Sequence, residues 1–264
     1  MKFDKESDVT IVLTSCKRFK LLKKTLESID RFNTYPVREV IITEDSGDER
    51  VWEAIPQHWK DFTRVIINEP KLGQIKSIDL AYSFVNTPYI FHCEDDWNFY
   101  RINFIEESKR VLENNSKILQ VWLRNFQNDV HKRYPFHYLG DKYSLDDFSY
   151  FILGSNDDTW KGFSFNPGLR RKKDYMIIQP YYRNIDSSIT EANISKQYHQ
   201  MGMSAAILEN SAVEHMGWGH HIKTSEDFKL LKIKNKIKIR YSLYGFLLGI
   251  ISFGIFEYFL NWIN

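Results

Sequence analysis

The chain has 264 residues, of which 43% are hydrophobic and 16% aromatic, a composition that excludes an intrinsically disordered protein. Its 36 basic and 34 acidic residues give a formal net charge of +2, which neither requires nor excludes nucleic acid as a partner. The only two cysteines, Cys16 and Cys93, exclude a disulfide framework and a cysteine-rich metal site. Together with a polar N-terminus, MKFDKESDV, that lacks the core of a signal peptide, they predict a cytoplasmic protein.

Strand-like and helix-like segments alternate over the first third of the chain. Short runs rich in β-branched residues predict strands at residues 9–13, 38–43, 63–68 and 88–93. The segments between them have helical character, with Leu21, Leu22, Leu26 and Ile29 at helical spacing in the first, followed by 51–59 and 71–85. This rhythm predicts an α/β fold with a mostly parallel central sheet flanked by helices.

Polar side chains follow three of the predicted strands. They are Thr14-Ser15, Glu44-Asp45 and the acidic run Glu94-Asp95-Asp96. The carboxyl ends of parallel strands lie along one edge of the sheet, so we expect these side chains to meet in one cleft. Clustered carboxylates suit Mg²⁺ or Mn²⁺, which also bind the phosphates of a substrate. An acidic turn that caps the next helix is an equally good interpretation of the run taken alone.

Three segments, in this order and spacing, resemble the GT-A fold glycosyltransferases, especially glycosyltransferase family 2. They are VTIVLTSCKRFKLLKKTLESI, IITEDSGD and YIFHCEDDWN, and the resemblance extends over about residues 8–221. It implies a Rossmann-like GT-A domain at 1–222, with a nucleotide-sugar half at about 1–100 and an acceptor half at about 101–222. The resemblance also implies a nucleotide-diphosphate sugar as donor and Mn²⁺ or Mg²⁺ as cofactor.

The resemblance assigns roles in the donor half. Thr14 and Asp45 would hold the nucleotide, and Asp95 and Asp96 match the positions that hold the ribose and the metal. His215 stands where such enzymes often supply a metal-binding histidine, although a structural role for it is equally expected.

Three positions depart from the family pattern. Cys16-Lys17-Arg18 replaces a frequent Asn-Arg pair, and Arg18 either reaches a phosphate or is a solvated cation at a helix start. Lys76 stands where relatives commonly place an arginine near the diphosphate. Glu94 extends the usual acidic pair and either binds the ribose or caps a turn.

The acceptor half offers a catalytic base and aromatic contacts. The segment 163–172, FSFNPGLRRK, resembles the start of the acceptor-side strand and loop, or is simply a turn. Glu191, at a predicted helix opening, is the candidate base for an inverting transfer, with an interaction with the helix dipole as the alternative. Trp97, Trp160 and Trp218 are candidate sugar contacts, each also a plausible core residue.

The C-terminal segment, 223–264, reads as a basic linker and an apolar tail. KLLKIKNKIKIR carries six basic residues and no acidic one, and the final 24 residues carry Glu257 as their single charge. Such a pair of segments predicts a C-terminal apolar helix on the cytoplasmic face of a membrane, either spanning it or lying on it. A final core helix is the alternative.

These features predict a metal-dependent, inverting glycosyltransferase of the hexosyltransferase type, acting on a glycan or lipid-linked acceptor. A catalytically silent membrane-bound scaffold on the same fold is the main alternative. A metal-dependent phosphoryl-transfer enzyme is less favoured, and no nucleic-acid partner is expected, because the basic excess lies beside the apolar tail.

Overall fold

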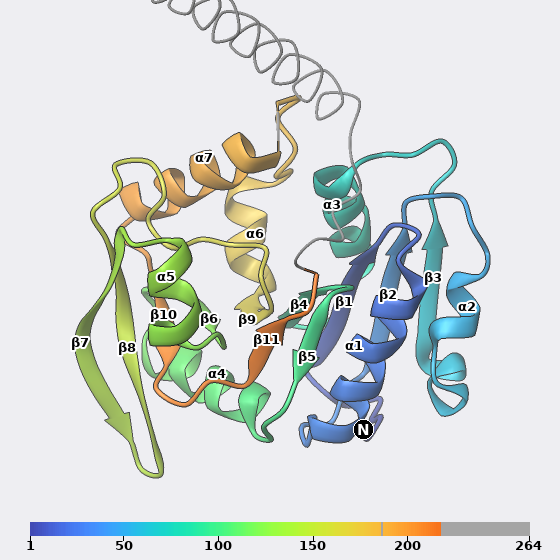
Figure 1. The fold of residues 1–264 in the computed structure, drawn as a ribbon, viewed down its shortest axis with the longest axis horizontal. Helices are drawn as coiled ribbons and strands as arrows, with labels where there is room; N and C mark the ends of the chain where they lie inside the picture. The colour runs from blue at the N-terminus through green and yellow to red at the C-terminus, as the bar shows by residue number, and fades with distance from the viewer. Residues whose placement is uncertain (186, 218–264) are drawn as a thin grey trace, which may run out of the picture. The chain divides into compact units, whose positions relative to one another are not determined.

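The computed structural model describes residues 1–185 and 187–217 (Figure 1), and Met1–Gly217 form one compact unit. The predicted tail at 223–264 and the candidate Trp218 lie outside the described residues. Within the described part of the chain, no helix has both the length and the apolar character that a membrane span requires.

The first half of the main sheet consists of parallel strands, as predicted. Their order is β3 (Thr63–Ile67), β2 (Glu39–Glu44), β1 (Val9–Ser15) and β4 (Tyr89–Glu94). Every residue of β1 is buried, because helices cover both faces of this central strand.

The second half of the sheet is mixed. The order continues with β9 (Gly168–Arg171), β6 (Ile118–Trp122), β10 (Ser204–Leu208), β8 (Phe148–Ser155) and β7 (His137–Leu145). Strand β9 runs antiparallel to both of its neighbours, β6 and β10 are parallel, and β8 and β7 continue the sheet antiparallel to its far edge. The predicted parallel arrangement therefore holds for β3, β2, β1 and β4 but not for the whole sheet.

Helices pack on both faces (Figure 1). Helices α1 (Phe19–Phe32), α2 (Val51–Ala54) and α4 (Phe104–Asn114) share one hydrophobic core with one face of the sheet. Helices α3 (Gln74–Phe84), α6 (Lys172–Ile178) and α7 (Ser187–Gln200) share a second core with the opposite face. The predicted helix at 51–59 is broken at Pro56, which forces Ile55 into an extended conformation; a 3₁₀ helix, η1 (Gln57–Phe62), follows.

Short elements complete the fold. A π-helical turn, η2 (Phe126–Val130), and the single turn α5 (His131–Arg133) follow β6. Strands β5 (Trp97–Phe99) and β11 (Val213–His215) pair antiparallel in a separate two-stranded sheet, with His215 opposite Trp97. This pairing carries His215 beside the acidic run that ends β4.

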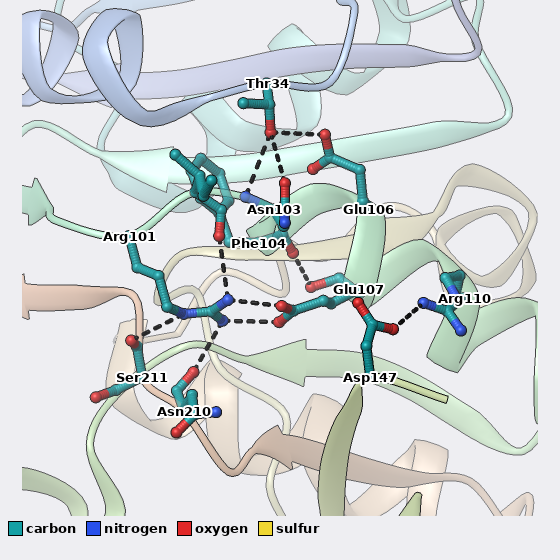
Figure 2. A network of polar contacts seen from close by, with 12 residues as sticks. Thr34, Arg101, Asn103, Phe104, Glu106, Glu107, Arg110, Asp147, Asn210 and Ser211 are labelled. Atoms are coloured by element: carbon teal, nitrogen blue, oxygen red, sulfur yellow. Dashed lines mark hydrogen bonds and ion pairs between the residues drawn. The ribbon is translucent and has the colours of Figure 1, made fainter. Parts of the chain in front are cut away.

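Arg101 fixes the chain where it enters β11 (Figure 2). Its guanidinium donates to both carboxylate oxygens of Glu107 in α4, at 2.6 and 2.7 Å. It also donates to the carbonyls of Asn210 (2.9 Å) and Ser211 (3.2 Å). The position of β11, and with it that of His215, is thus tied to a core helix rather than left to a free loop.

Candidate active site

The carboxyl ends of β1, β2 and β4 lie in register at one edge of the sheet. Thr14 pairs with Thr43 on one side and with Glu94 on the other, and Ser15 pairs with Glu44. The prediction that the polar clusters converge is therefore confirmed. Thr14 itself is buried between the two acidic strand ends.

The carboxylates that end β2 organise the loops around the cleft. Buried Glu44 accepts hydrogen bonds from the Lys17 amide (2.9 Å) and from the amide and hydroxyl of Ser46. Asp45 accepts from the amides of Leu72 (2.7 Å) and Gly73 (2.9 Å), just before α3. In this structure Asp45 fixes the loop that opens α3, and its predicted contact with a nucleotide base remains a prediction.

Asp95 and Asp96 are nearly inaccessible and share one arginine. Their side chains are 1% and 6% exposed, and that of Arg18 is 22% exposed. The guanidinium donates to both oxygens of Asp95 and, from Nη1, to Oδ2 of Asp96 at 2.7 Å. Arg18 therefore pairs with the acidic run, and its interpretation as a solvated cation was wrong.

Asp96 also contacts His215. The Nε2 atom of His215 lies 3.2 Å from Oδ2 of Asp96, and the Met216 amide donates to the Asp96 carbonyl at 2.8 Å. A Cβ atom on Gly217 would come within 2.1 Å of Oδ2, so only glycine fits there. Burial disfavours the charged form of Asp96, but the hydrogen bond from His215 and the charge of Arg18 outweigh it and lower the pKa of Asp96.

The other two acids of the run have raised pKa values. Burial, reinforced by the charge of Asp96, raises the pKa of Glu94 to about 8, although Trp97 donates to it. Burial also raises the pKa of Asp95 to about 6, against the opposing charge of Arg18. The run leads into strand β5 rather than a helix, so the helix-capping interpretation was wrong.

The carboxylate and imidazole donors fit a hard divalent cation. Adjacent ligands of an octahedral ion with bonds of about 2.1 Å lie about 3.0 Å apart. Oδ2 of Asp96 and Nε2 of His215 are 3.2 Å apart, and the buried Oδ1 of Asp96 accepts no hydrogen bond from the described residues. The described residues contain no ready-made group of three acidic, histidine or cysteine ligands, and Arg18 bonds both aspartates. A metal ion held by these few side chains would keep coordination positions open for a substrate.

We expected Glu191 at the opening of a helix. It lies instead in the second turn of α7. Its Oε1 atom accepts from the Phe165 amide at 2.8 Å, which joins α7 to the segment before β9. Burial raises the pKa of Glu191, while hydrogen bonds from Phe165 and Ser164 oppose the rise. Its charge also contributes to the raised pKa of Glu94, after the larger effects of burial and of Asp96.

Other candidates lie outside the acidic cluster. Lys76 is exposed on α3 and places its ammonium 4.5 Å from the centre of the Tyr182 ring, away from Asp95 and Asp96. Trp97 is 1% exposed and packs edge-on against His215, which favours the core interpretation over an open sugar contact. Trp160 is half-buried in an aromatic cluster, and His92 of β4 lies in the core.

The structure adds residues that no sequence signal singled out. The Gln74 amide donates to Oε1 of Glu94 at 2.7 Å, and buried Arg124 pairs with Asp129 while lying 5.4 Å from the ring centre of Trp97. Gly217 is required by its closeness to Asp96. Gly217 lies two residues after the predicted metal histidine, and this position in the sequence could have drawn attention to it. The contacts of Gln74 and Arg124 depend on long-range packing and could not be predicted in this way.

Known proteins give the architecture a family. The sequence model of Glycosyl transferase family 2 matches residues 10–175. No curated protein sequence matches the chain. Among solved structures, it is similar to the mannosyltransferase PcManGT from Pyrobaculum calidifontis in complex with GDP-Man and Mn²⁺, at 11% identity and a TM-score of 0.56, over 76% of this chain and 55% of that one.

Two further structures show the same fold. GalNAc-T7 with UDP, GalNAc and Mn²⁺ is 11% identical with a TM-score of 0.56, over 78% of this chain and 42% of that one. TarS 1–349 from S. aureus is 13% identical with a TM-score of 0.55, over 82% of this chain and 61% of that one. The chain matches about half the length of these proteins, and at such identities the likeness shows the fold alone. Because the family model covers more than half of its residues, the chain belongs to glycosyltransferase family 2, with the GT-A fold of these enzymes.

Proposed function

We propose that the chain transfers a hexose, with inversion, from a nucleotide-diphosphate sugar to a hydroxyl group of a glycan or lipid-linked acceptor. The observation that carries this proposal is the contact of His215, in β11, with Asp96, which lies next to Asp95 just after the carboxyl end of β4. Two of the similar structures contain a sugar nucleotide, or a nucleotide and a sugar, together with Mn²⁺, which supports a donor of this class.

The donor would bind along the carboxyl ends of β1, β2 and β4. Thr14 and Asp45 lie at the ends of β1 and β2, where a nucleotide would rest, and Asp95 would contact its ribose. Asp96, His215 and Asp95 would hold Mn²⁺ or Mg²⁺, which would supply Lewis-acid stabilisation of the departing diphosphate. Lys76 would have to leave Tyr182 to reach that diphosphate.

Glu191 would act as the base. Its raised pKa increases its affinity for a proton, which suits a group that deprotonates the acceptor hydroxyl. A hydroxyl held at Glu191 would attack the anomeric carbon from the side opposite the diphosphate, and this direction of attack inverts the configuration. The hydrogen bond from the Phe165 amide would hold the carboxylate in place during the transfer.

The basic and apolar segments at 223–264 support a place for the enzyme at the cytoplasmic face of a membrane. Six basic residues would contact anionic lipid, and the final 24 residues would enter or line the bilayer. An enzyme held there would meet a lipid-linked acceptor. Sedimentation of the full chain with phosphatidylglycerol vesicles, but not with phosphatidylcholine vesicles, would support this location; equal recovery in both supernatants would refute it.

Binding of nucleoside diphosphates tests the donor site. Calorimetric titration of the full chain with UDP, GDP, CDP and dTDP, with Mn²⁺ and with chelator, should show metal-dependent binding of at least one of them. Asp96→Asn should abolish it, and the exposed Asp147→Asn on the β7–β8 turn should leave it unchanged. If the folded protein binds none of the four, the scaffold alternative replaces the enzyme. If it binds one but hydrolyses no sugar nucleotide, the fold is a silent binding module.

A further inference from the structure

The guanidinium of Arg18 occupies the place beside Asp95 and Asp96 where a metal ion would be expected to bind. Its guanidinium bridges Asp95 and Asp96, and the Oδ2 atom of Asp96 that accepts from Arg18 also faces His215. One oxygen atom thus serves both the arginine and the histidine of the predicted metal site. A metal ion bound to that oxygen would compete directly with Arg18.

The burial of the two aspartates explains why Arg18 is there. Two carboxylates that are 1% and 6% exposed cannot both stay charged side by side without a counter-charge. Arg18 supplies one positive charge and several directed hydrogen bonds. A divalent cation at the same place would neutralise both carboxylates and would repel the guanidinium at close range.

The backbone at Arg18 is held by hydrogen bonds that do not involve the Arg18 side chain. The carbonyl of Arg18 accepts from the amides of Leu21 (2.9 Å) and Leu22 (3.0 Å) in α1, and the preceding Lys17 is held by Glu44 in a left-handed conformation with φ of 58°. The side chain makes no helix-capping bond and is 22% exposed. Departure of the side chain from the aspartates would break none of the backbone hydrogen bonds that fix the loop.

We infer that Arg18 is an exchangeable counter-ion, which pairs with Asp95 and Asp96 in the metal-free protein and turns to the donor diphosphate when a divalent cation replaces it. This inference rests on the proposed donor site. Charge supports it, because a divalent cation and Arg18 together exceed the charge of two carboxylates by one, and this excess would attract an anionic diphosphate. Metal and nucleotide would then bind cooperatively, since each removes the other's obstacle.

Arg18→Gln separates the two roles of the residue. Without nucleotide, the variant should bind Mn²⁺ at least ~10-fold more tightly than the wild type, because no arginine competes. With saturating Mn²⁺, it should bind the preferred nucleoside diphosphate at least ~10-fold more weakly, because a charge-assisted contact is lost. Mn²⁺ affinity is read from the free-ion signal in electron paramagnetic resonance, and nucleotide affinity from calorimetry, both on the full chain.

Arg110 provides a matched control. It also bridges two consecutive aspartates, Asp146 and Asp147, but on an exposed turn (Figure 2 shows its contact with Asp147). Arg110→Gln should change neither affinity. Arg18→Lys covers the case in which Arg18→Gln fails to fold: one ammonium reaches fewer oxygens than the guanidinium, so Mn²⁺ should bind more tightly than in the wild type and the nucleotide more weakly.

The outcomes distinguish this inference from the proposed function. If wild-type protein binds neither Mn²⁺ nor a nucleoside diphosphate, the donor site itself is refuted. If the wild type binds both, but Mn²⁺ affinity is unchanged or weakened in the folded Arg18 variant, the exchange is refuted and the donor site stands. Tighter Mn²⁺ binding with unchanged nucleotide binding would refute the second role of Arg18, the transfer to the diphosphate.

Discussion

Replacing Glu94 by glutamine should remove a pH-dependent loss of stability from the cleft. Burial, reinforced by the charge of Asp96, raises the pKa of Glu94 from 4.5 to about 8 in the folded chain. Between these values the folded protein keeps a proton that the unfolded chain has released. The free energy of unfolding therefore falls as pH rises through this window, by at most about 1.4 kcal/mol per pH unit for one proton.

The range from pH 6.5 to 7.5 isolates this group. Asp95, with a pKa raised to about 6, has released most of its proton below this range. His92 and His137 have lowered pKa values, so the unfolded chain still binds more protons at these two residues in the lower part of the range, but this effect is common to both proteins and cancels in the comparison. We expect the wild type to lose about 1.4 kcal/mol relative to Glu94→Gln across this unit of pH.

Urea unfolding followed by tryptophan fluorescence, with chelator present and in half-unit pH steps, measures the difference. The Glu94 carboxylate accepts one hydrogen bond from Gln74 and one from Trp97. In Glu94→Gln, the new amide group can keep only one of them as an acceptor, and the resulting loss of stability does not depend on pH. In the control Asp147→Asn, the pKa of the native carboxyl is lowered by Arg110, so its titration lies below the range and its curve should run parallel to the wild type. Parallel curves for Glu94→Gln as well would refute the burial argument.

Three other substitutions test separate parts of the structure. Glu191→Gln should keep nucleotide binding but reduce turnover at least ~100-fold in steady-state assays. It should also abolish the increase in rate that the wild type shows as pH rises past the raised pKa of Glu191. A retained pH profile would exclude Glu191 as the base. Gly217→Ala should displace Asp96 and weaken Mn²⁺ binding at least ~10-fold in calorimetry, and unchanged affinity would show that Asp96 does not bind the metal. Arg171→Met leaves buried Asp174 without its 2.7 Å partner and should lower the free energy of unfolding by about 3–5 kcal/mol in urea titrations; a loss under ~1 kcal/mol would contradict its buried role.

The parallel half of the fold was predictable because its signals are local. Short β-branched runs predicted four strands, which became the buried strands β1, β2 and β4 and the partly exposed edge strand β3. The convergence of Thr14, Glu44 and Glu94 follows from their common position at strand ends, which needs no knowledge of side-chain packing.

The mixed half was not predictable in the same way. Gly168–Arg171 has only four residues, and no periodicity in it indicates that it inserts antiparallel between β4 and β6. The interaction of Arg18 with Asp95 joins residues 77 positions apart. Trp97 was proposed as a sugar contact because exposed aromatic rings stack on sugars, but its backbone amide donates to Thr25 of α1 and its ring is buried. Contacts of this kind depend on how the helices settle on the sheet, which single-sequence patterns do not report.

The acidic run itself shows why the site, unlike the fold, is costly. Three consecutive acids lie at the end of a core strand, where burial raises the pKa of two of them and the third is held charged by Arg18 and His215. None of them caps a helix, and one buried oxygen of Asp96 accepts no hydrogen bond from the described residues. Apolar residues would close this end of β4 at lower cost. The buried acidic run is therefore unfavourable for folding alone. A cation bound to these carboxylates, together with a diphosphate, would offset this local cost.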